Sequence, residues 1–583
     1  MTSRNAATQG ESRGAASRPD GERAVSDGAA APASMTGTLQ AASAFGATAA
    51  QGHGAQAGGR SIEGNPALPL FSGIAVALMV WQGAAWALAG NYLLAGPWEV
   101  AHYLAENTGL IARALGITLT NAGWGFVAGN LAAVGLALIV ALLPRAAPVV
   151  ASLALVVFCL PLVATGPILR VLYGPGPGPQ ITLAALAVFF TTFVPLLVGL
   201  RAAPASLFDL VRLYGRGAWT AFVQIRLMAA LPYLMAGLQI AAPAALLGAM
   251  VGEFTGAESG LGVLTLRAMR GLDTPATWAI ATVASGAAML AYGALGRIAH
   301  ALAPARPEVL LAPPAVSAPG GAGIRWLRGP VTAALTLAVL LAIWWLVMEA
   351  LSLPRFFAKR PDDLWTYLIA APQAAANRAV LWSATAQSLV YVLPGYLAGL
   401  ALGAGLAMAL ALSPVASGVL MPVAVALRSV PIVITAPLIV LALGRESVGT
   451  VTIVAVMIFF PALVACLHGL RQAPGQVLDV MATYGAGRWA RLWHAQVPAM
   501  LPAFFAAARM SVPAAVLAVT VAEWLATGTG LGNLMALTAS TSDYNLLWSA
   551  VVVVALGSAL GYALVGWAER AVLARVAPEQ LRG

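Results

Sequence analysis

Long apolar runs separated by short polar stretches make up most of this sequence. A helix needs roughly 20 apolar residues to cross hydrocarbon about 30 Å thick, and twelve runs reach that length. Six lie near residues 68–95, 117–143, 149–172, 181–200, 231–253 and 276–302, and six near residues 330–352, 385–412, 416–443, 449–467, 502–525 and 546–573. Such runs predict helices, because barrel strands would be short and alternating. We therefore expect an all-α polytopic membrane protein of about 12 transmembrane helices.

The composition agrees with a membrane protein and affects how the net positive charge is interpreted. Of 583 residues, 60% are hydrophobic and 9% are charged, with a formal net charge of +10. The basic residues are spread between the apolar runs and form no patch interleaved with aromatic residues, so we expect no nucleic-acid partner. Cytoplasmic loops of membrane proteins carry an excess of arginine and lysine, which is a sufficient reason for the positive charge.

The positions of the arginines predict an orientation. If the first run enters from the cytoplasm, both chain ends and the even-numbered turns face the cytoplasm. The arginines on that side include Arg201, Arg212, Arg216, Arg226, Arg297, Arg306, Arg325, Arg328, Arg471, Arg488 and Arg491. The outside stretch 353–382 is an exception, because it carries Arg355, Lys359, Arg360 and Arg378. Both termini are thus predicted to be cytoplasmic, with membrane lipid around the helices.

The two halves of the chain are copies of one another. A shift of 270 residues superposes them without a gap from residue 118 to residue 262. The matched pairs include Thr118 with Ser388, Gly125 with Gly395, Gly129 with Gly399, Pro161 with Pro431, Tyr214 with Tyr484, Trp219 with Trp489, Glu253 with Glu523, and Gly260–Gly262 with Gly530–Gly532. This register indicates a duplicated six-helix unit. Because six is even, both copies start on the same side, which gives parallel pseudo-twofold symmetry rather than an inverted repeat.

The repeat divides the chain into five segments. We expect a first six-helix repeat over residues 66–303 and a second over 329–575, joined by a Pro/Ala/Gly-rich linker at 304–328. Residues 1–65, rich in Ala, Gly, Ser and Arg, predict a disordered cytoplasmic tail, and residues 576–583 a C-terminal tail. The glycines Gly395, Gly399 and Gly403, and likewise Gly125 and Gly129, are spaced by four and predict close helix packing.

A semi-polar segment recurs between the fourth and fifth runs of each repeat. It reads "DLVRLYGRGAWTAFVQIRLMAALP" from Asp209 and "DVMATYGAGRWARLWHAQVPAMLP" from Asp479. Val477, Leu478, Met481 and Tyr484 recur at helical spacing, Gly485 ends that helix, and a second helix carries Trp489 and Trp493. Two short amphipathic helices joined at a glycine would leave an apolar face that needs a partner. The alternative is a plain polar turn between two spans.

These residues resemble the EAA loop of permease subunits of ATP-binding-cassette (ABC) importers. The order is an acidic residue, a glycine six positions later, and prolines after it, as in Asp479, Gly485, Pro498 and Pro502. The stretches "AEWLATGTGLGNLM" (522–535) and "GEFTGAESGLGVL" (252–264) are similar to the end of span five in the nitrate, taurine and alkanesulfonate branch.

The resemblance implies a fused, double-length type I permease that depends on an extracytoplasmic solute-binding protein. Two copies of a cytoplasmic ABC ATPase would dock on the repeated loops. The residues implied in docking are Asp209, Tyr214, Gly215, Gly217, Trp219, Asp479, Tyr484, Gly485, Gly487 and Trp489. The implied location is a bacterial cytoplasmic (inner) membrane. The implied cargo is a small oxyanion such as nitrate, a sulfonate such as taurine, or bicarbonate, with a thiamine precursor or ferric ion as alternatives.

No catalytic chemistry is expected in this chain. Lys359 is its one lysine, and its context "FFAKRP" lacks the Gly-x4-Gly-Lys-Ser/Thr pattern of a phosphate-binding loop. We expect no cofactor here, with ATP and magnesium on the partner ATPase. The five histidines are scattered without metal-ligand spacing, so neither a metal site nor an enzyme is expected. An ion-coupled secondary transporter is the remaining alternative, although it would need more carboxylates within the membrane.

Ionisable residues within apolar runs are costly and are therefore candidates for function. Glu253 and Glu523 recur near the outer ends of span five and predict a gate or a helix-pairing role. Arg509 lies mid-span and has Gln239 as its counterpart, so it breaks the symmetry. It is the first choice for a residue that touches an anionic cargo, and the alternative is an ion pair with a carboxylate on a neighbouring helix. Arg428 is expected to reach the headgroups.

Overall fold

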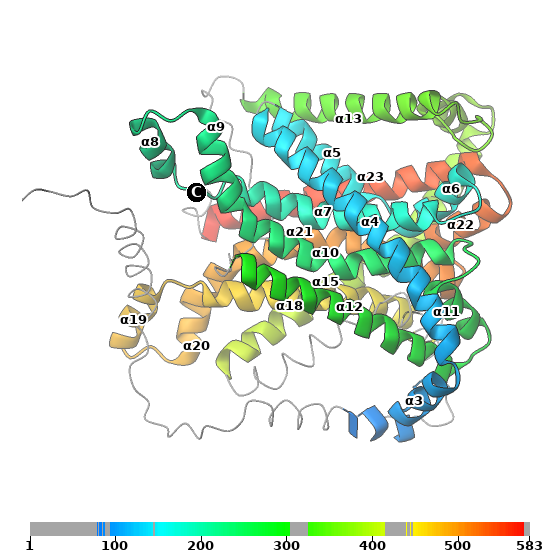
Figure 1. The fold of residues 1–583 in the computed structure, drawn as a ribbon, viewed down its shortest axis with the longest axis horizontal. Coiled ribbons are helices and arrows are strands. Elements are labelled where there is room, and N and C mark those ends of the chain that lie inside the picture. The colour runs from blue at the N-terminus through cyan, green and yellow to red at the C-terminus, as the bar shows by residue number, and fades with distance from the viewer. Residues whose placement is uncertain are drawn as a thin grey trace, which may run out of the picture. The chain divides into compact units, whose positions relative to one another are not determined.

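The computed structural model describes residues 78–79, 81–83, 85–87, 94–143, 146–303, 325–413, 436, 439, 443–444 and 447–576. The chain divides into residues 1–73 and one compact unit of residues 74–583, to which all the described residues belong. Figure 1 shows this unit as helices only, most of them long and running in roughly the same direction. The all-α prediction is therefore confirmed for the described residues.

The described part of the first repeat consists of four long helices and several short ones. In chain order these are α3 (Pro97–Glu106), α4 (Thr108–Leu142), α5 (Ala147–Cys159), α6 (Leu162–Tyr173), α7 (Gly178–Gly199), α8 (Ala205–Leu213), α9 (Ala218–Ala221), the π-helical η2 (Phe222–Leu227), α10 (Met228–Phe254), α11 (Leu261–Arg270) and α12 (Thr274–Leu302).

The second repeat follows the same order. Its elements are α13 (Arg325–Ala350), α14 (Pro361–Trp365), η4 (Thr366–Ala370), α15 (Ala374–Leu412), α18 (Ser447–Arg471), α19 (Gly475–Thr483), α20 (Arg488–Arg491), η5 (Leu492–Gln496), α21 (Val497–Ala522), η6 (Glu523–Thr527), α22 (Gly530–Ser540) and α23 (Tyr544–Val576).

Nine of the predicted spans are present in the described part of the chain as helices long and apolar enough to cross a membrane. The runs 68–95 and 416–443 fall largely outside the described residues. The expected single span over 149–172 is wrong, because the structure divides it into α5 and α6. Leu160 has an extended backbone with ψ of 128°, and Pro161, which follows it, has ψ of 105°. The residue before a proline is disfavoured in the helical region, which explains a break at this position.

Glycines set the distance between the long helices. A β-carbon on Gly395, Gly399 or Gly403 of α15 would lie 2.7 to 2.8 Å from the carbonyl oxygens of Val451, Ala455 and Phe459 on α18. In the first repeat a β-carbon on Gly125 of α4 would lie 2.7 Å from the carbonyl oxygen of Ile181 on α7. Side chains cannot fit at such separations, so the backbones of α4 and α7, and of α15 and α18, touch directly. The packing role predicted for these glycines is confirmed.

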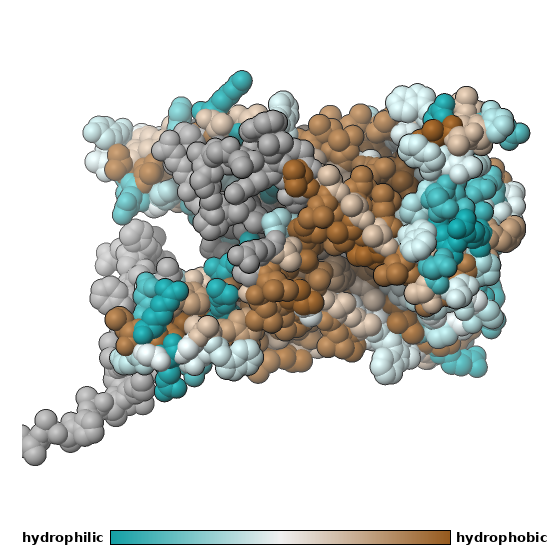
Figure 2. Space-filling view, turned by 90° about the horizontal axis from the view of Figure 1, so that it is seen from above, coloured by the Kyte–Doolittle hydropathy of each residue, from teal (hydrophilic) through white to brown (hydrophobic). Residues whose placement is uncertain are grey.

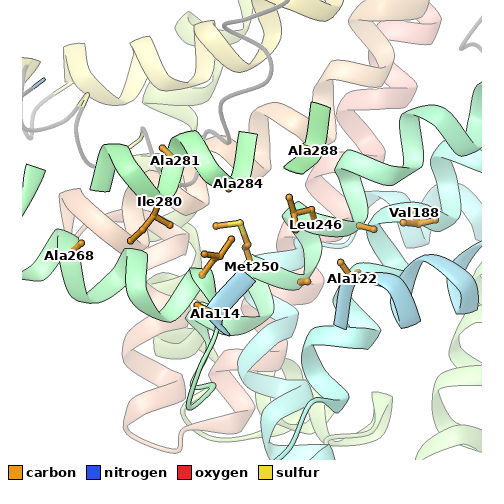
Figure 3. Packing of buried hydrophobic residues seen from close by; sticks show 14 of the residues in the cluster. Ala114, Ala122, Val188, Leu246, Met250, Ala268, Ile280, Ala281, Ala284 and Ala288 are labelled. Carbon is orange, nitrogen blue, oxygen red and sulfur yellow. The ribbon is translucent and has the colours of Figure 1, made fainter. Parts of the chain in front are cut away.

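Small side chains fill the remaining space between the helices. In the first repeat, one buried cluster combines alanines with a few large residues, among them Leu246, Met250 and Ile280. Figure 3 shows these three residues between Ala114, Ala122, Ala268, Ala281, Ala284 and Ala288, which come from neighbouring helices. Van der Waals contact between close-fitting surfaces is the main source of helix association in lipid, because lipid tails are as apolar as the helices.

The outer surface of the helices is apolar as well. On α4, the exposed side chains include Ile117, Trp124, Val127, Leu131 and Ile139. Figure 2 shows a hydrophobic zone in the middle of the molecule, with hydrophilic side chains gathered towards the two ends of the long helices. This distribution is the one expected of a protein whose central zone is solvated by lipid.

The two repeats pack against each other through their fifth spans and α6. Val251 of α10 belongs to a buried cluster formed mainly by the second repeat, and Leu247 and Phe254 of the same helix pack against it. In return, Met510 of α21 packs against the cluster around Phe193 in the first repeat. The boundary between the repeats is therefore interdigitated rather than a flat contact.

A short helix precedes the second long helix of each repeat, and its position is also duplicated. Tyr103 on α3 and Tyr367 on η4 each lie near an aspartate that caps the last helix of its repeat. Asp273 accepts a hydrogen bond from the Ala276 amide at 3.0 Å, and Asp543 accepts one from the Leu546 amide at 3.2 Å. Burial, and to a smaller extent the aspartate charge, raises the pKa of each tyrosine. Both tyrosines are therefore neutral at physiological pH.

Glycine packing on α15 can be tested with two substitutions on the same helix. Gly399→Leu should destabilise the protein by about 1–3 kcal/mol or more, because the side chain must displace the α18 backbone. Gly405→Leu is the control, since no atom lies within 4 Å of a β-carbon placed there, and leucine has the higher helix propensity. Thermal unfolding in lipid nanodiscs measures both. Equal midpoints for the two variants would contradict the close approach of α15 and α18.

Candidate functional site

The repeated loop between the fourth and fifth spans forms a compact helical knob in the first repeat. We call residues 204–227 the first coupling segment. Its helix α8 ends at Leu213 and is capped by Tyr214, and Gly215 follows with a positive φ of 65°. The Gly215 amide donates to the Arg212 carbonyl at 2.9 Å and the Arg216 amide to the Val211 carbonyl at 3.0 Å. This pair of bonds is a Schellman motif, which needs a residue such as glycine in the left-handed region.

The second coupling segment, residues 474–496, repeats this geometry position by position. Gly485 has a φ of 72°, its amide donates to the Ala482 carbonyl at 3.0 Å, and the Ala486 amide donates to the Met481 carbonyl at 2.9 Å. The next short helix begins after Gly487, just as α9 begins after Gly217. The predicted helix–glycine–helix arrangement is thus present in both copies. The requirement for a left-handed turn explains why glycine stands at 215 and 485.

Large side chains on both coupling segments are exposed. Tyr214 is 73% exposed and Trp219 71%, while their counterparts Tyr484 and Trp489 are 87% and 64% exposed. Figure 1 shows α8, α9, α19 and α20 at the same end of the long helices. Exposed aromatic residues grouped at one end of a membrane protein indicate a surface for another protein.

The acidic residue of the first coupling segment forms a local ion pair. Asp209 lies 3.4 Å from Arg212 one helical turn later, and both side chains are largely exposed. In the second segment, position 482 is alanine, so Asp479 has no arginine at the equivalent place. The two segments therefore share their backbone and their exposed aromatic residues but differ in the placement of charge.

Glu253 lies at the opposite end of the long helices, where it joins three elements. It is the last residue but one of α10, and its side chain is buried. Its Oε1 accepts a hydrogen bond from the Thr118 hydroxyl of α4 at 2.7 Å, and its Oε2 accepts one from the Gly262 amide of α11 at 2.7 Å. The Leu261 amide donates to the Thr118 hydroxyl oxygen at 2.9 Å. We call this arrangement the carboxylate clasp.

The second repeat has a similar clasp, although within the described residues the Oε1 of Glu523 does not accept the hydroxyl hydrogen bond that the Oε1 of Glu253 accepts. The Oε2 of Glu523 accepts a hydrogen bond from the Gly532 amide at 2.8 Å, and the Leu531 amide donates to the Ser388 hydroxyl oxygen at 2.9 Å. Gln387 adds a contact that the first repeat lacks, because its side-chain oxygen accepts a hydrogen bond from the Gly530 amide at 3.0 Å. In both repeats the carboxylate faces the N-terminus of a short helix, α11 or α22, whose free amides and dipole favour a negative charge.

Glycine is required beside each clasp. A β-carbon on Gly260 or Gly530 would overlap the carboxylate of Glu253 or Glu523, and both glycines have positive φ, 134° and 76°. The Gly-Leu-Gly sequence after the acidic residue therefore has a physical explanation. Its first glycine makes room for the carboxylate, and the amides of the leucine and the second glycine complete the clasp.

Arg509, on α21, forms the alternative predicted for it, an ion pair with a carboxylate on a neighbouring helix. Its Nη1 lies 3.1 Å from Oε2 of Glu569 on α23, and both side chains are largely buried. The guanidinium also lies over the ring of Tyr562, 5.7 Å from its centroid. At the same places the first repeat has Gln239, Ala299 and Tyr292, and the Gln239 amide donates to the Tyr292 carbonyl at 3.4 Å. A contact between Arg509 and a cargo stays a prediction.

Sequence reasoning missed several partners of these residues. It singled out Glu253 and Glu523 but not Gln387 or Glu569, although Thr118 and Ser388 were visible as a matched pair. Arg428 lies outside the described residues. In the described ranges no group of three or more histidine, cysteine, aspartate or glutamate side chains could hold a metal ion.

The clasp predicts that two neighbouring glycines differ in how much stability the protein loses when each is replaced by alanine. Gly528 and Gly530 both have positive φ, but a β-carbon on Gly528 has open space around it. Gly528→Ala should lower the free energy of unfolding by about 1–2 kcal/mol, because alanine is disfavoured in the left-handed backbone region. Gly530→Ala should shift the thermal midpoint at least twice as far, because its methyl group also displaces the Glu523 carboxylate. Equal shifts would mean that this carboxylate is not held against Gly530.

Comparison with known proteins identifies the family. Residues 125–360 and 399–577 match the family described as "Binding-protein-dependent transport system inner membrane component". The chain is 30% identical over 233 residues to a "Probable ABC transporter permease protein" of Haemophilus influenzae, which covers 40% of this chain and 93% of the relative. It is 30% identical over 212 residues to the taurine transport system permease protein TauC of Escherichia coli (36% of this chain, 77% of the relative). It is also 31% identical over 151 residues to the riboflavin transport system permease protein RibX of Chloroflexus aurantiacus (26% and 56%). The chain therefore belongs to the inner membrane components of binding-protein-dependent transport systems, as a fused, multi-pass permease of an ABC importer.

Proposed function

We propose that this permease carries a small oxyanion into the bacterial cytoplasm, driven by two copies of one ATPase subunit and supplied by an extracytoplasmic solute-binding protein. The observation that carries the proposal is the duplicated coupling segment. Both copies present a tyrosine after the α-helix, a glycine turn and a tryptophan four positions beyond that glycine. Two surfaces with the same backbone and the same exposed aromatic residues suit two copies of one partner.

A continuous helix connects each coupling segment to the far end of the molecule. Residues Ala218–Phe254 in the first repeat and Arg488–Leu525 in the second are helical throughout, with a π-helical turn near the start of each. Prolines interrupt the hydrogen bonding at Pro232 and Pro243, and again at Pro502 and Pro513. A displacement of the coupling segment would therefore tilt the fifth span, which flexes where the proline removes a hydrogen bond.

The carboxylate clasp would pass that tilt to the outer end. Because Glu253 fastens the end of α10 to α4 and α11, and Glu523 fastens the end of α21 to α22, these elements would move together. In this proposal Glu253 and Glu523 act in helix pairing at the outer gate rather than in cargo contact. The coupling segments lie at the cytoplasmic end, as the distribution of arginines predicts.

The hydrolysis of ATP belongs to the partner in this proposal. A phosphate-binding loop needs a glycine-rich turn followed by lysine and serine or threonine, and Lys359, the chain's one lysine, is followed by Arg360 and Pro361. The Arg360 guanidinium pairs with Glu349 of α13 at 2.6 Å, which gives this basic residue a structural partner. We therefore place ATP and magnesium on the ATPase subunits.

The choice of an oxyanion rests on the relative whose name gives taurine as its cargo. The relative named for riboflavin makes a larger heterocycle the second candidate, alongside a thiamine precursor. Ferric ion and ion-coupled transport are further alternatives. Uptake of radiolabelled taurine, nitrate and riboflavin by cells with the complete transporter separates these cargos. Transport by the purified chain alone on a proton or sodium gradient would contradict the ABC mechanism.

The coupling segments generate a direct test. The double variant Tyr214→Ala/Tyr484→Ala should reduce ATPase co-purification and ATP-driven uptake at least tenfold, since buried aromatic anchors at interfaces are typically worth about 2 kcal/mol or more each. Its thermal midpoint should not change, because both side chains are exposed. The control is Trp98→Ala on α3, an equally exposed aromatic residue at the other end of the helices. Normal ATPase binding by the tyrosine variant would exclude this docking surface.

A further inference from the structure

The boundary between the repeats contains a cation that the helix dipole favours but that no described carboxylate balances. Arg170 lies in the last turn of α6 and is half-buried. In the 270-residue register its counterpart is Val440, so the charge is present in one repeat only. A cation kept partly out of water needs a compensating partner or a functional reason.

The break at Pro161 places α6 between the repeats. Ile168 belongs to, and Leu172 packs against, a cluster formed mainly by the second repeat around Leu531, Met535 and Leu547. The opposite side of α6 faces its own repeat, where a β-carbon on Gly166 would overlap Thr255 in the loop after α10. Figure 1 shows α6 beside α22, at the end of the long helices that lies away from the coupling segments.

Arg170 has no carboxylate partner at this place. Its Nε lies 3.8 Å from the position of a β-carbon on Gly256, in the loop that joins α10 to α11. Glu258 is in the same loop, yet among the described residues Arg170 forms neither an ion pair nor a side-chain hydrogen bond. Two other arginines of this end have carboxylate partners, because Arg355 lies 3.2 Å from Asp362 and Arg360 lies 2.6 Å from Glu349.

Arg170 and Arg509 differ in whether a carboxylate already balances the guanidinium charge, and this difference decides which of them can bind an anionic cargo. Both arginines lie near the boundary of the repeats and both lack an arginine counterpart. The charge of Arg509 is already balanced by Glu569 at 3.1 Å, whereas that of Arg170 is not balanced by any described side chain. A free guanidinium offers paired N–H donors that suit carboxylate, sulfonate and similar oxyanions.

We propose that Arg170 is a specificity-determining residue that receives the oxyanion group of the cargo at the outer mouth between the repeats. The proposal rests on the proposed function and deepens it. Arg170 lies beside the α10–α11 loop that follows the Glu253 clasp, so a cargo held there is next to the elements that the fifth span moves. A single cargo molecule between two similar halves needs one such group, which agrees with its presence in one repeat only.

The local charge can be measured on the purified full-length chain without its partners. Ala257→Cys places a thiol next to Gly256, and the two native cysteines are buried. Two methanethiosulfonate reagents modify this thiol, of which the ethanesulfonate reagent is anionic and the ethyltrimethylammonium reagent is cationic. The rates of modification by the two reagents are compared. Replacing Arg170 by its counterpart, Arg170→Val, should lower the anion-to-cation rate ratio about fourfold, as expected for one unit charge roughly 8–10 Å away in water-like surroundings.

Two further variants separate a charge effect from a structural effect. Arg170→Lys should restore most of the ratio, because it keeps the charge. The control Arg267→Leu removes an exposed arginine of α11 and introduces the leucine found at the equivalent place in α22. It should change the anion-to-cation rate ratio less than Arg170→Val does. An unchanged ratio in Arg170→Val, or a loss that Arg170→Lys does not restore, would overturn the proposal.

Uptake by cells with the complete transporter tests the cargo role. For radiolabelled taurine, Arg170→Val should raise KM at least fivefold with a smaller change in maximal rate, whereas Arg267→Leu should not. An unchanged KM in Arg170→Val would overturn the role of Arg170 while leaving the proposed function intact. If the native chain carries riboflavin but neither taurine nor nitrate, the oxyanion part of the proposed function is wrong, and the cargo role of Arg170 is wrong with it.

Discussion

Direct contact between helix backbones is the interaction on which this structure depends. In lipid the apolar surface gives no preference for one neighbour over another, so helices associate where they can approach most closely. The glycines of α4 and α15 allow this contact with α7 and α18, where a β-carbon would lie less than 3 Å from a carbonyl oxygen. All the long helices of a repeat are placed relative to these two pairs, and so are the polar segments at their ends.

Polar interactions then act at the two ends of this apolar frame. At one end, the Schellman turns at Gly215 and Gly485 hold the exposed aromatic residues of the coupling segments. At the other end, Glu253 accepts hydrogen bonds from the Thr118 hydroxyl and the Gly262 amide, and Glu523 accepts one from the Gly532 amide, which fastens each fifth span to its neighbours. A continuous helix with two prolines joins the two ends in each repeat. In the proposed function, this helix links the docking surface for the ATPase to the outer gate.

Periodicity and duplication in the sequence predicted the helical class, nine described spans, the glycine packing and both coupling turns, because each depends on local spacing. The break at Pro161 was not predictable in this way. Pro167, Pro195 and Pro243 lie inside helices that continue, so the presence of a proline does not by itself reveal which apolar run is broken. The pairing of Arg509 with Glu569 was likewise hidden, since two residues 60 positions apart come together only through the packing of α21 on α23. The clasp was half visible, because the amides of Gly262 and Gly532 follow each glutamate by nine residues, whereas Thr118 lies 135 residues from Glu253.

The Arg509–Glu569 pair has a consequence for how such a protein can evolve. In a permease made of two identical subunits, every substitution is present twice and its two copies face each other across the symmetry axis. Joining both halves in one polypeptide removes that restriction, so one half can acquire an arginine and a matching glutamate while the other keeps Gln239 and Ala299. The gene fusion therefore permits a division of labour between the halves that a homodimer cannot reach by point mutation.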